Sequence, residues 1–128
     1  MINLLLDTHA FIWFVEGSNE LSQNAKNSIL DSKNIKYISV ASLWKMSIKV
    51  NQGKLLLKSP FESIMDDINE NGFNLLNINF EHFVENAKLP WHHKDPFDRL
   101  LISQSNIDGM TLVSRDSEFK NYTANIIW

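Results

Sequence analysis

Three aspartates of this 128-residue chain stand at positions where chemistry could be concentrated. Asp7 ends an apolar run near the start of the chain, Asp116 follows a second apolar run near its end, and Asp98 lies in the first turn of a predicted long helix. Crowded carboxylates repel one another, and a hard divalent cation such as Mg²⁺ or Mn²⁺ relieves that repulsion by binding their oxygens. Such a cation polarises a phosphodiester and activates water, so the three residues favour metal-dependent hydrolysis.

The same residues also have a purely structural interpretation. Asp7, Asp95 and Asp116 each immediately precede a predicted helix, where an aspartate N-cap stabilises the protein by about 0.5–2 kcal/mol relative to alanine. Asp98 stands three residues after Asp95, where a negative charge suits the helix dipole. The spacing alone therefore leaves both the catalytic and the capping interpretation open.

Short apolar strands that alternate with helices must position these residues. Strands are predicted at 2–6, 37–39, 73–76, 111–113 and 125–128, and helices at 8–15, 22–31, 40–50, 60–69, 79–88, 95–108 and 116–119. This alternation predicts an α/β fold with a mostly parallel central sheet, because right-handed crossovers place helices on both faces. Ligands of such sheets bind beyond the carboxyl ends of the strands, where Asp7 and Asp116 are expected.

Composition limits the class of protein. The length fits one domain spanning residues 1–128, and the 44% hydrophobic and 21% charged residues are typical of a globular chain. The chain has no cysteine, which excludes disulfides, a thiolate nucleophile and cysteine-ligated zinc. A net charge of −3 argues against a general basic surface for nucleic acid, but not against a nuclease. Without a signal peptide or an apolar membrane span, we expect a cytoplasmic protein with no membrane partner.

Four segments carry a more specific pattern: LLDTHAFIW at 5–13, SVASLW at 39–44, HHKDPFDRLLISQ at 92–104 and LVSRD at 112–116. In this order they resemble the motifs of PIN-domain toxins, the VapC-type ribonucleases of bacterial type II toxin–antitoxin systems. The third segment is the most specific, because this acidic start rarely precedes an apolar helix by chance. The resemblance spans nearly the whole chain.

The resemblance implies a PIN-like three-layer α/β/α sandwich with a Mg²⁺ or Mn²⁺ site at four acidic positions. Three of these positions fall on Asp7, Asp98 and Asp116. In such enzymes the carboxylates hold the metal and orient the water that cleaves RNA internally, leaving a 5′-phosphate. The resemblance also implies a small cognate antitoxin, an RNA substrate and a homodimer.

Several other residues have expected roles around this site. By the resemblance, Thr8 and Ser114 support the site with hydroxyl groups, while Asp95 caps the long helix. Lys94 and Arg99 flank the acidic positions and are candidates for phosphate contacts, although a solvated position at the helix end is an equal alternative.

Position 45 departs from the family pattern. The family places a glutamate after the tryptophan of the second segment, whereas this chain has Trp44-Lys45. The change removes an oxygen ligand and adds a positive charge, so metal affinity is expected to fall. We hypothesise that Lys45 reaches Asp7, Asp98 or Asp116 and relieves their repulsion without activating water. An exposed Lys45 is the alternative, with Trp44 expected to face the core.

Two functions follow from these residues. The first is a metal-dependent endoribonuclease toxin that Lys45 weakens or inactivates, either as an inactivating mutation or as a natural change. The second is a non-catalytic PIN-type module that binds RNA or an antitoxin. A zinc site at His92 and His93 is disfavoured, because the chain offers no further histidine or cysteine at ligand spacing.

Overall fold

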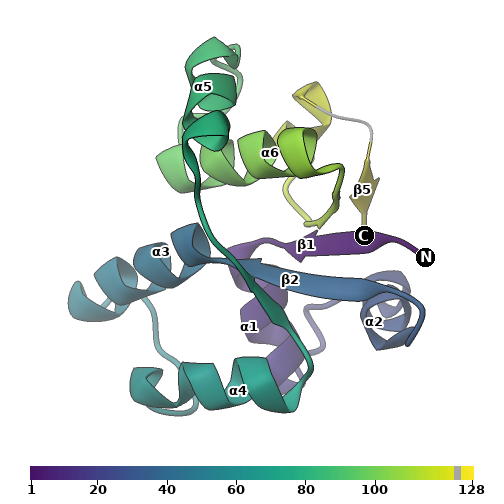
Figure 1. Cartoon of the computed structure of the whole chain (residues 1–128). Coiled ribbons are helices and arrows are strands. Elements are labelled where there is room, and N and C mark those ends of the chain that lie inside the picture. The colour runs from purple at the N-terminus through teal and green to yellow at the C-terminus, as the bar shows by residue number, and fades with distance from the viewer. Residues whose placement is uncertain (123–124) are drawn as a thin grey trace.

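The computed structural model describes residues 1–122 and 125–128 and contains one five-stranded sheet. The strand order is β3-β2-β1-β4-β5, and each neighbouring pair is parallel (Figure 1). The strands are Asn3–Leu6 (β1), Ile35–Ser39 (β2), Asn74–Leu76 (β3), Thr111–Val113 (β4) and Ile126–Ile127 (β5). The predicted α/β fold with a mostly parallel sheet is therefore confirmed.

Helices cover both faces of this sheet. In Figure 1, α1, α2 and α4 lie on one side of the central strands, and α5 and α6 lie on the other. The helices are Thr8–Glu16 (α1), Gln23–Leu30 (α2), Val40–Asn51 (α3), Ile64–Glu70 (α4), Phe80–Lys88 (α5) and Pro96–Asp108 (α6), with 3₁₀ turns at Phe61–Ser63 (η1) and Ser117–Asn121 (η2). The three layers agree with the predicted sandwich.

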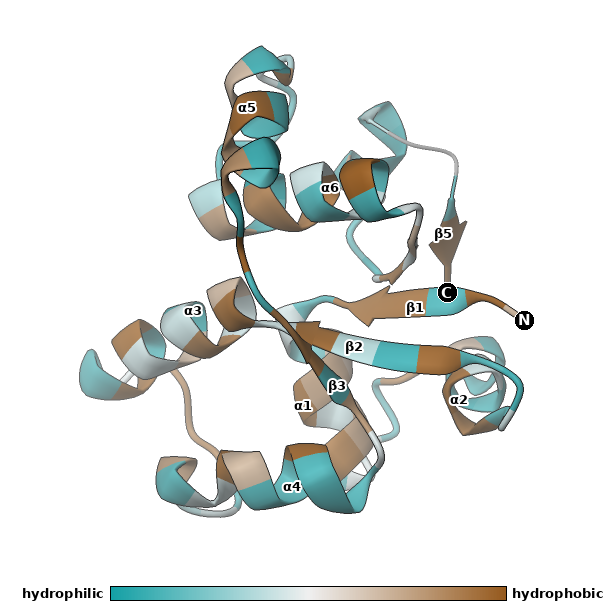
Figure 2. Ribbon diagram, in the orientation of Figure 1, coloured by the Kyte–Doolittle hydropathy of each residue, from teal (hydrophilic) through white to brown (hydrophobic). Residues whose placement is uncertain are grey.

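Alternate residues of β1 face the two layers. Leu4 and Leu6 belong to a core cluster with α1, α2 and α4, whereas Leu5 packs with α6 on the opposite face. All three leucines are fully buried, as a strand covered on both faces requires. Figure 2 shows β1 as a largely hydrophobic ribbon at the centre of the molecule.

The capping interpretation of the aspartates is confirmed. Asp7 accepts a hydrogen bond from the Ala10 N–H at the start of α1. Asp95 starts α6 in the same way, and Asp116 starts η2. Because α1 and α3 follow directly after β1 and β2, their first turns lie at the carboxyl edge of the sheet.

Some boundaries and one orientation differ from the predictions. The helix predicted at 60–69 is divided into η1 and α4, and β2 begins two residues before its predicted start. The expectation that Trp44 faces the core is wrong: its side chain is 60% exposed and packs edge-on against Phe97. Within the described residues, no helix is both long and apolar enough to cross a membrane.

Candidate active site

A cavity of about 450 Å³ opens at the carboxyl edge of the sheet. The structure brings the three predicted aspartates together in it, with β1, α6 and the segment after β4 contributing one each. The cavity is lined by Asp7, Thr8, His9, Trp13, Lys45, His93, Asp95, Asp98, Arg115 and Asp116.

Asp7 is held rigidly at the floor of this cavity. Its Oδ1 accepts a hydrogen bond from the Ala10 N–H at 2.8 Å, and its Oδ2 accepts one from the Ser114 hydroxyl at 2.6 Å. Burial raises the pKa of Asp7 in spite of these two bonds. Ser114 therefore supports the carboxylate, as expected. Thr8 lies beside it, and its buried hydroxyl has no hydrogen-bond partner among the described residues.

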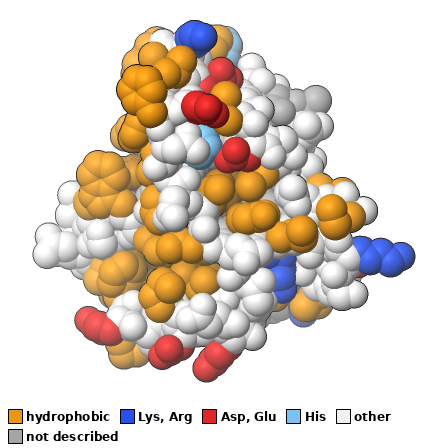
Figure 3. Space-filling model, viewed as in Figure 1, with side chains coloured by type: hydrophobic (Ala, Val, Ile, Leu, Met, Phe, Trp, Pro, Cys, Tyr) orange, Lys and Arg blue, Asp and Glu red, His pale blue; other side chains and the backbone are white. Residues whose placement is uncertain are grey.

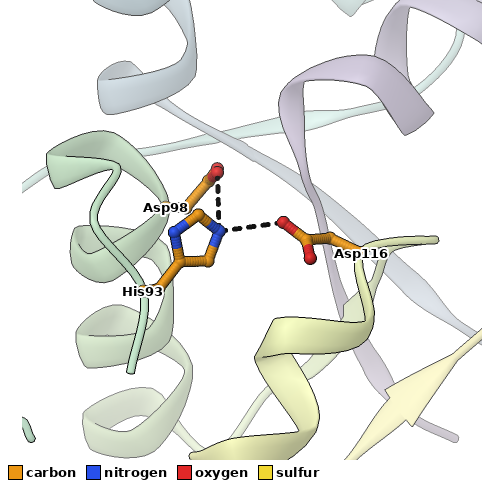
Figure 4. A group of neighbouring side chains, drawn as sticks. All are labelled: His93, Asp98 and Asp116. Atoms are coloured by element: carbon orange, nitrogen blue, oxygen red, sulfur yellow. Dashed lines mark hydrogen bonds and ion pairs between the residues drawn. The ribbon is translucent and has the colours of Figure 1, made fainter. Parts of the chain in front are cut away.

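His93 stands between the other two aspartates (Figure 4). Its Nε2 lies 2.8 Å from Asp116 Oδ2 and 3.3 Å from Asp98 Oδ2. Its Nδ1 accepts a hydrogen bond from the Asp95 N–H at 3.1 Å and lies 3.5 Å from Glu118 Oε2. Burial raises the pKa of Asp98 to about 6, because the attraction of Lys45 does not outweigh the loss of water.

Lys45 contacts the same Asp98 oxygen as His93. Its Nζ lies 3.0 Å from Asp95 Oδ2 and 3.6 Å from Asp98 Oδ2. Burial alone would lower the pKa of Lys45, but the charges of Asp98 and Asp95 outweigh burial and raise it. The expected reach toward Asp98 is confirmed, the contact with Asp95 was not predicted, and the alternative of an exposed Lys45 is wrong because the residue is only 8% exposed.

The two predicted phosphate contacts lie elsewhere. Arg99 is buried, and its guanidinium donates hydrogen bonds to the carbonyl oxygens of Pro90 and Leu89. Neither Arg99 nor Lys94 is among the residues that line the cavity. The structure thus gives Arg99 a role in holding the loop before α6. Arg115, which the sequence patterns did not single out, is the arginine at the cavity.

His93 was also missed as a site residue, because its position depends on contacts between distant segments. The hydroxyl of Tyr122 accepts a hydrogen bond from the His93 N–H at 2.6 Å and donates one to the Pro90 carbonyl. These contacts hold the backbone beside His93, which lines the cavity. The available signal was the five-residue separation between His93 and Asp98 across a strong helix start.

A model of the PIN-domain family matches residues 4–125. The chain belongs to the PIN-domain family. No curated protein matched the sequence.

Solved structures give the same fold. VapBC2 from Rickettsia felis bound to a promoter DNA fragment has a TM-score of 0.69 at 16% identity, over 98% of this chain and 96% of that one. A toxin–antitoxin complex from Klebsiella pneumoniae has a TM-score of 0.66 at 13% identity, over 98% and 96%. FitAcB from Neisseria gonorrhoeae has a TM-score of 0.64 at 18% identity, over 96% and 95%. At these identities the likeness concerns the fold.

PIN nucleases usually use divalent metals, and the donor groups of this PIN domain fit such an ion. Asp98 and Asp116 present carboxylate oxygens to one cavity, and both lie within hydrogen-bonding distance of His93 Nε2. Lys45 places an ammonium in the same cavity, 3.6 Å from Asp98. The carboxylate donors fit a divalent cation.

Proposed function

We propose that this chain is the nuclease toxin of a toxin–antitoxin pair and hydrolyses phosphodiester bonds within RNA with Mg²⁺ or Mn²⁺. The observation that carries the proposal is the convergence of Asp7, Asp98 and Asp116 in one cavity of a PIN domain. The similar structures are supporting evidence, because they include a toxin–antitoxin complex.

Four residues of the cavity have chemical roles in this proposal. Asp98 and Asp116 would hold the cation, which would supply Lewis-acid chemistry toward the phosphodiester and water. Asp7, fixed by Ser114 and the first turn of α1, accepts a hydrogen bond from the attacking water and orients it. Arg115 lies at the cavity and attracts the phosphate of the substrate.

Lys45 makes the predicted activity weak or absent in this chain. Its ammonium forms ion pairs with Asp95 and Asp98, so it competes directly with a cation for the Asp98 carboxylate. The same observation favours a second candidate function, a non-catalytic PIN-type module that binds RNA or an antitoxin and does not cleave.

The proposed partners are a cognate antitoxin and a second copy of the chain, acting in the cytoplasm. Large hydrophobic side chains are exposed on and around α5, including Phe80 at 79% and Phe83 at 51%. Figure 3 shows hydrophobic side chains gathered from α5 down across this face of the molecule. Exposed apolar surface of this kind supports a protein partner.

A paired RNA-cleavage assay tests the proposal. The wild type, Lys45→Glu and Lys45→Glu with Asp7→Asn are incubated with total RNA in Mg²⁺ or Mn²⁺, and Lys33→Glu, an exposed lysine outside the cavity, controls for the charge change. We expect Lys45→Glu to cut far faster than the wild type and Lys33→Glu, and Asp7→Asn to abolish the gain. If the folded Lys45→Glu variant leaves all RNA intact, the nuclease proposal fails and the binding module replaces it.

A further inference from the structure

We infer that His93, Asp98 and Asp116 form a binding site for a first-row transition ion of the Zn²⁺ type, with the imidazole Nε2 as its nitrogen ligand. This site goes beyond the proposed function, because it assigns a ligand that the acidic positions do not include and a different class of metal. It can be tested on protein that cleaves nothing.

Two of the three distances between the donor atoms fit such an ion. His93 Nε2 lies 2.8 Å from Asp116 Oδ2 and 3.3 Å from Asp98 Oδ2, and all three ligand atoms lie within 4.8 Å of one another. An ion with bonds of about 2.0–2.2 Å spaces its ligands roughly 2.8–3.6 Å apart, from octahedral to tetrahedral geometry. In Figure 4 both carboxylates converge on the same ring nitrogen, so an ion can bind there after small shifts.

The surroundings of His93 are those of a metal ligand. The ring is only 9% exposed and packs against Phe119, which restricts its rotation. Glu118 Oε2 lies 3.5 Å from Nδ1, on the side away from the two aspartates. Histidines that bind metal through one nitrogen commonly donate the other N–H to a carboxylate, and Glu118 is placed to accept it.

Binding requires a change of tautomer that the site can accommodate. In the structure Nδ1 accepts the Asp95 N–H, so the neutral ring carries its proton on Nε2, between the carboxylates. When the ion takes this place, the proton moves to Nδ1 and is donated to Glu118. The Asp95 N–H then loses its acceptor, so binding is weaker than at a preformed site.

Charge and space favour a divalent ion on this side of the cavity. Two carboxylates and a neutral imidazole carry a charge of −2, and Lys45, 3.0 Å from Asp95 Oδ2 and 3.6 Å from Asp98 Oδ2, offsets this charge only in part. Thr8 lines the same cavity, and its buried hydroxyl has no hydrogen-bond partner among the described residues.

The imidazole determines the class of ion. Mg²⁺ prefers a shell of oxygen ligands and gives up its water reluctantly. Imidazole nitrogen is instead a good ligand for Zn²⁺, Ni²⁺ and Co²⁺. With the family's glutamate replaced by Lys45, His93 supplies the third ligand, and selectivity shifts from Mg²⁺ to these ions.

Titration with Co²⁺, a coloured substitute for Zn²⁺, tests the site without RNA. We expect wild-type protein to develop Co²⁺ absorption bands at one equivalent, Zn²⁺ to remove them, and a hundredfold excess of Mg²⁺ to leave them unchanged. His93→Gln should weaken Co²⁺ binding at least 10–100-fold, and Glu118→Gln by about tenfold. The matched control is His92→Gln, since His92 is exposed and is not among the residues that line the cavity.

A second measurement covers the case in which His93→Gln does not fold. In the nitrogen NMR spectrum of wild-type protein, Zn²⁺ should shift the ring signals of His93 and leave those of His92 in place. Equal Co²⁺ affinity in His93→Gln, or Zn²⁺ shifts confined to other histidines, would overturn the site. Metal binding without RNA cleavage would leave this inference standing while the nuclease fails, and Mg²⁺-dependent cleavage by a protein whose Co²⁺ affinity His93→Gln leaves unchanged would do the reverse.

Discussion

Lys45 is a buried cation whose charge is balanced by Asp95 and Asp98. Removing one partner of a buried ion pair typically costs about 3–5 kcal/mol, because the remaining charges lose their compensation. The Asp95 side chain is 28% exposed, which reduces the loss. We expect Lys45→Met to lower the free energy of unfolding by about 2–3 kcal/mol in urea at pH 7.5. Lys33→Met, at an exposed position, should cost less than about 0.5 kcal/mol. Equal losses in the two variants would contradict a compensating role for Lys45.

The raised pKa of Asp98 predicts that the stability of the protein depends on pH. Its pKa is raised from 3.8 to about 6 in the folded state, so the folded protein binds more protons at this group than the unfolded chain between these values. The free energy of unfolding therefore falls as the pH rises through this window, by up to about 3 kcal/mol. Asp98→Asn should make this fall shallower in metal-free urea titrations at pH 4.5 and 7. The exposed control Asp66→Asn should retain it, and retention by Asp98→Asn would refute the assignment.

At the residue scale, the sequence predicted the aspartates better than their neighbours. A residue that directly follows a buried parallel strand lies at the carboxyl edge of the sheet, so Asp7 is at this edge in any parallel arrangement. Trp44 and Lys45 point in different directions on α3, as adjacent helix positions must, but hydrophobicity predicts the reverse of the observed burial. The inversion occurs because ion pairs with Asp95 and Asp98 compensate the buried ammonium, which no local pattern reveals.

The loop between α5 and α6 is the element that completes the site. Arg99 and Tyr122 hold it through hydrogen bonds to Leu89, Pro90 and the backbone of the two following histidines. The Tyr122 hydroxyl thus forms hydrogen bonds with several backbone groups at once. Loss of the Tyr122 hydroxyl leaves polar backbone groups without a hydrogen-bond partner. Each buried group left in this way destabilises the protein by about 1–3 kcal/mol.

Tyr122→Phe tests this role of the loop. We expect the variant to lose about 1–3 kcal/mol of unfolding free energy and to bind Co²⁺ several-fold more weakly, because His93 is no longer anchored by the Tyr122 hydroxyl. Tyr37→Phe removes the same atom from β2 and should leave Co²⁺ affinity unchanged. Denaturation curves and Co²⁺ titrations measure the two effects, and unchanged affinity in Tyr122→Phe would show that the loop is held by other contacts.

The elements with strong local signals were predicted closely. Pro96 and Gly109 bound α6 as expected, with Gly109 at a φ of 65° that favours glycine. The division between η1 and α4 was not predicted, because nothing in the local sequence distinguishes a 3₁₀ turn from the first turn of a helix.

At the scale of the molecule, alternating strands and helices were enough to predict an α/β fold with a mostly parallel sheet, but not its strand order. The order β3-β2-β1-β4-β5 places β1, the first strand in the sequence, at the centre. Which strand lies beside β1 depends on contacts between β1 and β4, more than one hundred residues apart. The geometry of the site depends on this strand order, because the β1–β4 pairing brings the Ser114 hydroxyl within 2.6 Å of Asp7 Oδ2.

The sheet separates two core clusters, and this separation predicts how mutations combine. Ile29 of α2 and Ile102 of α6 are both fully buried, in clusters on opposite faces of the sheet. Ile→Val at either position should cost about 0.5–1.5 kcal/mol, a loss that a single domain tolerates. Because the two side chains belong to separate clusters, the losses should add within about 0.5 kcal/mol in the double variant. Urea unfolding of both single variants and the double variant measures this sum. A larger deviation would mean that the two layers are coupled through β1, and that substitutions in α2 can disturb the cavity at the far end of the strand.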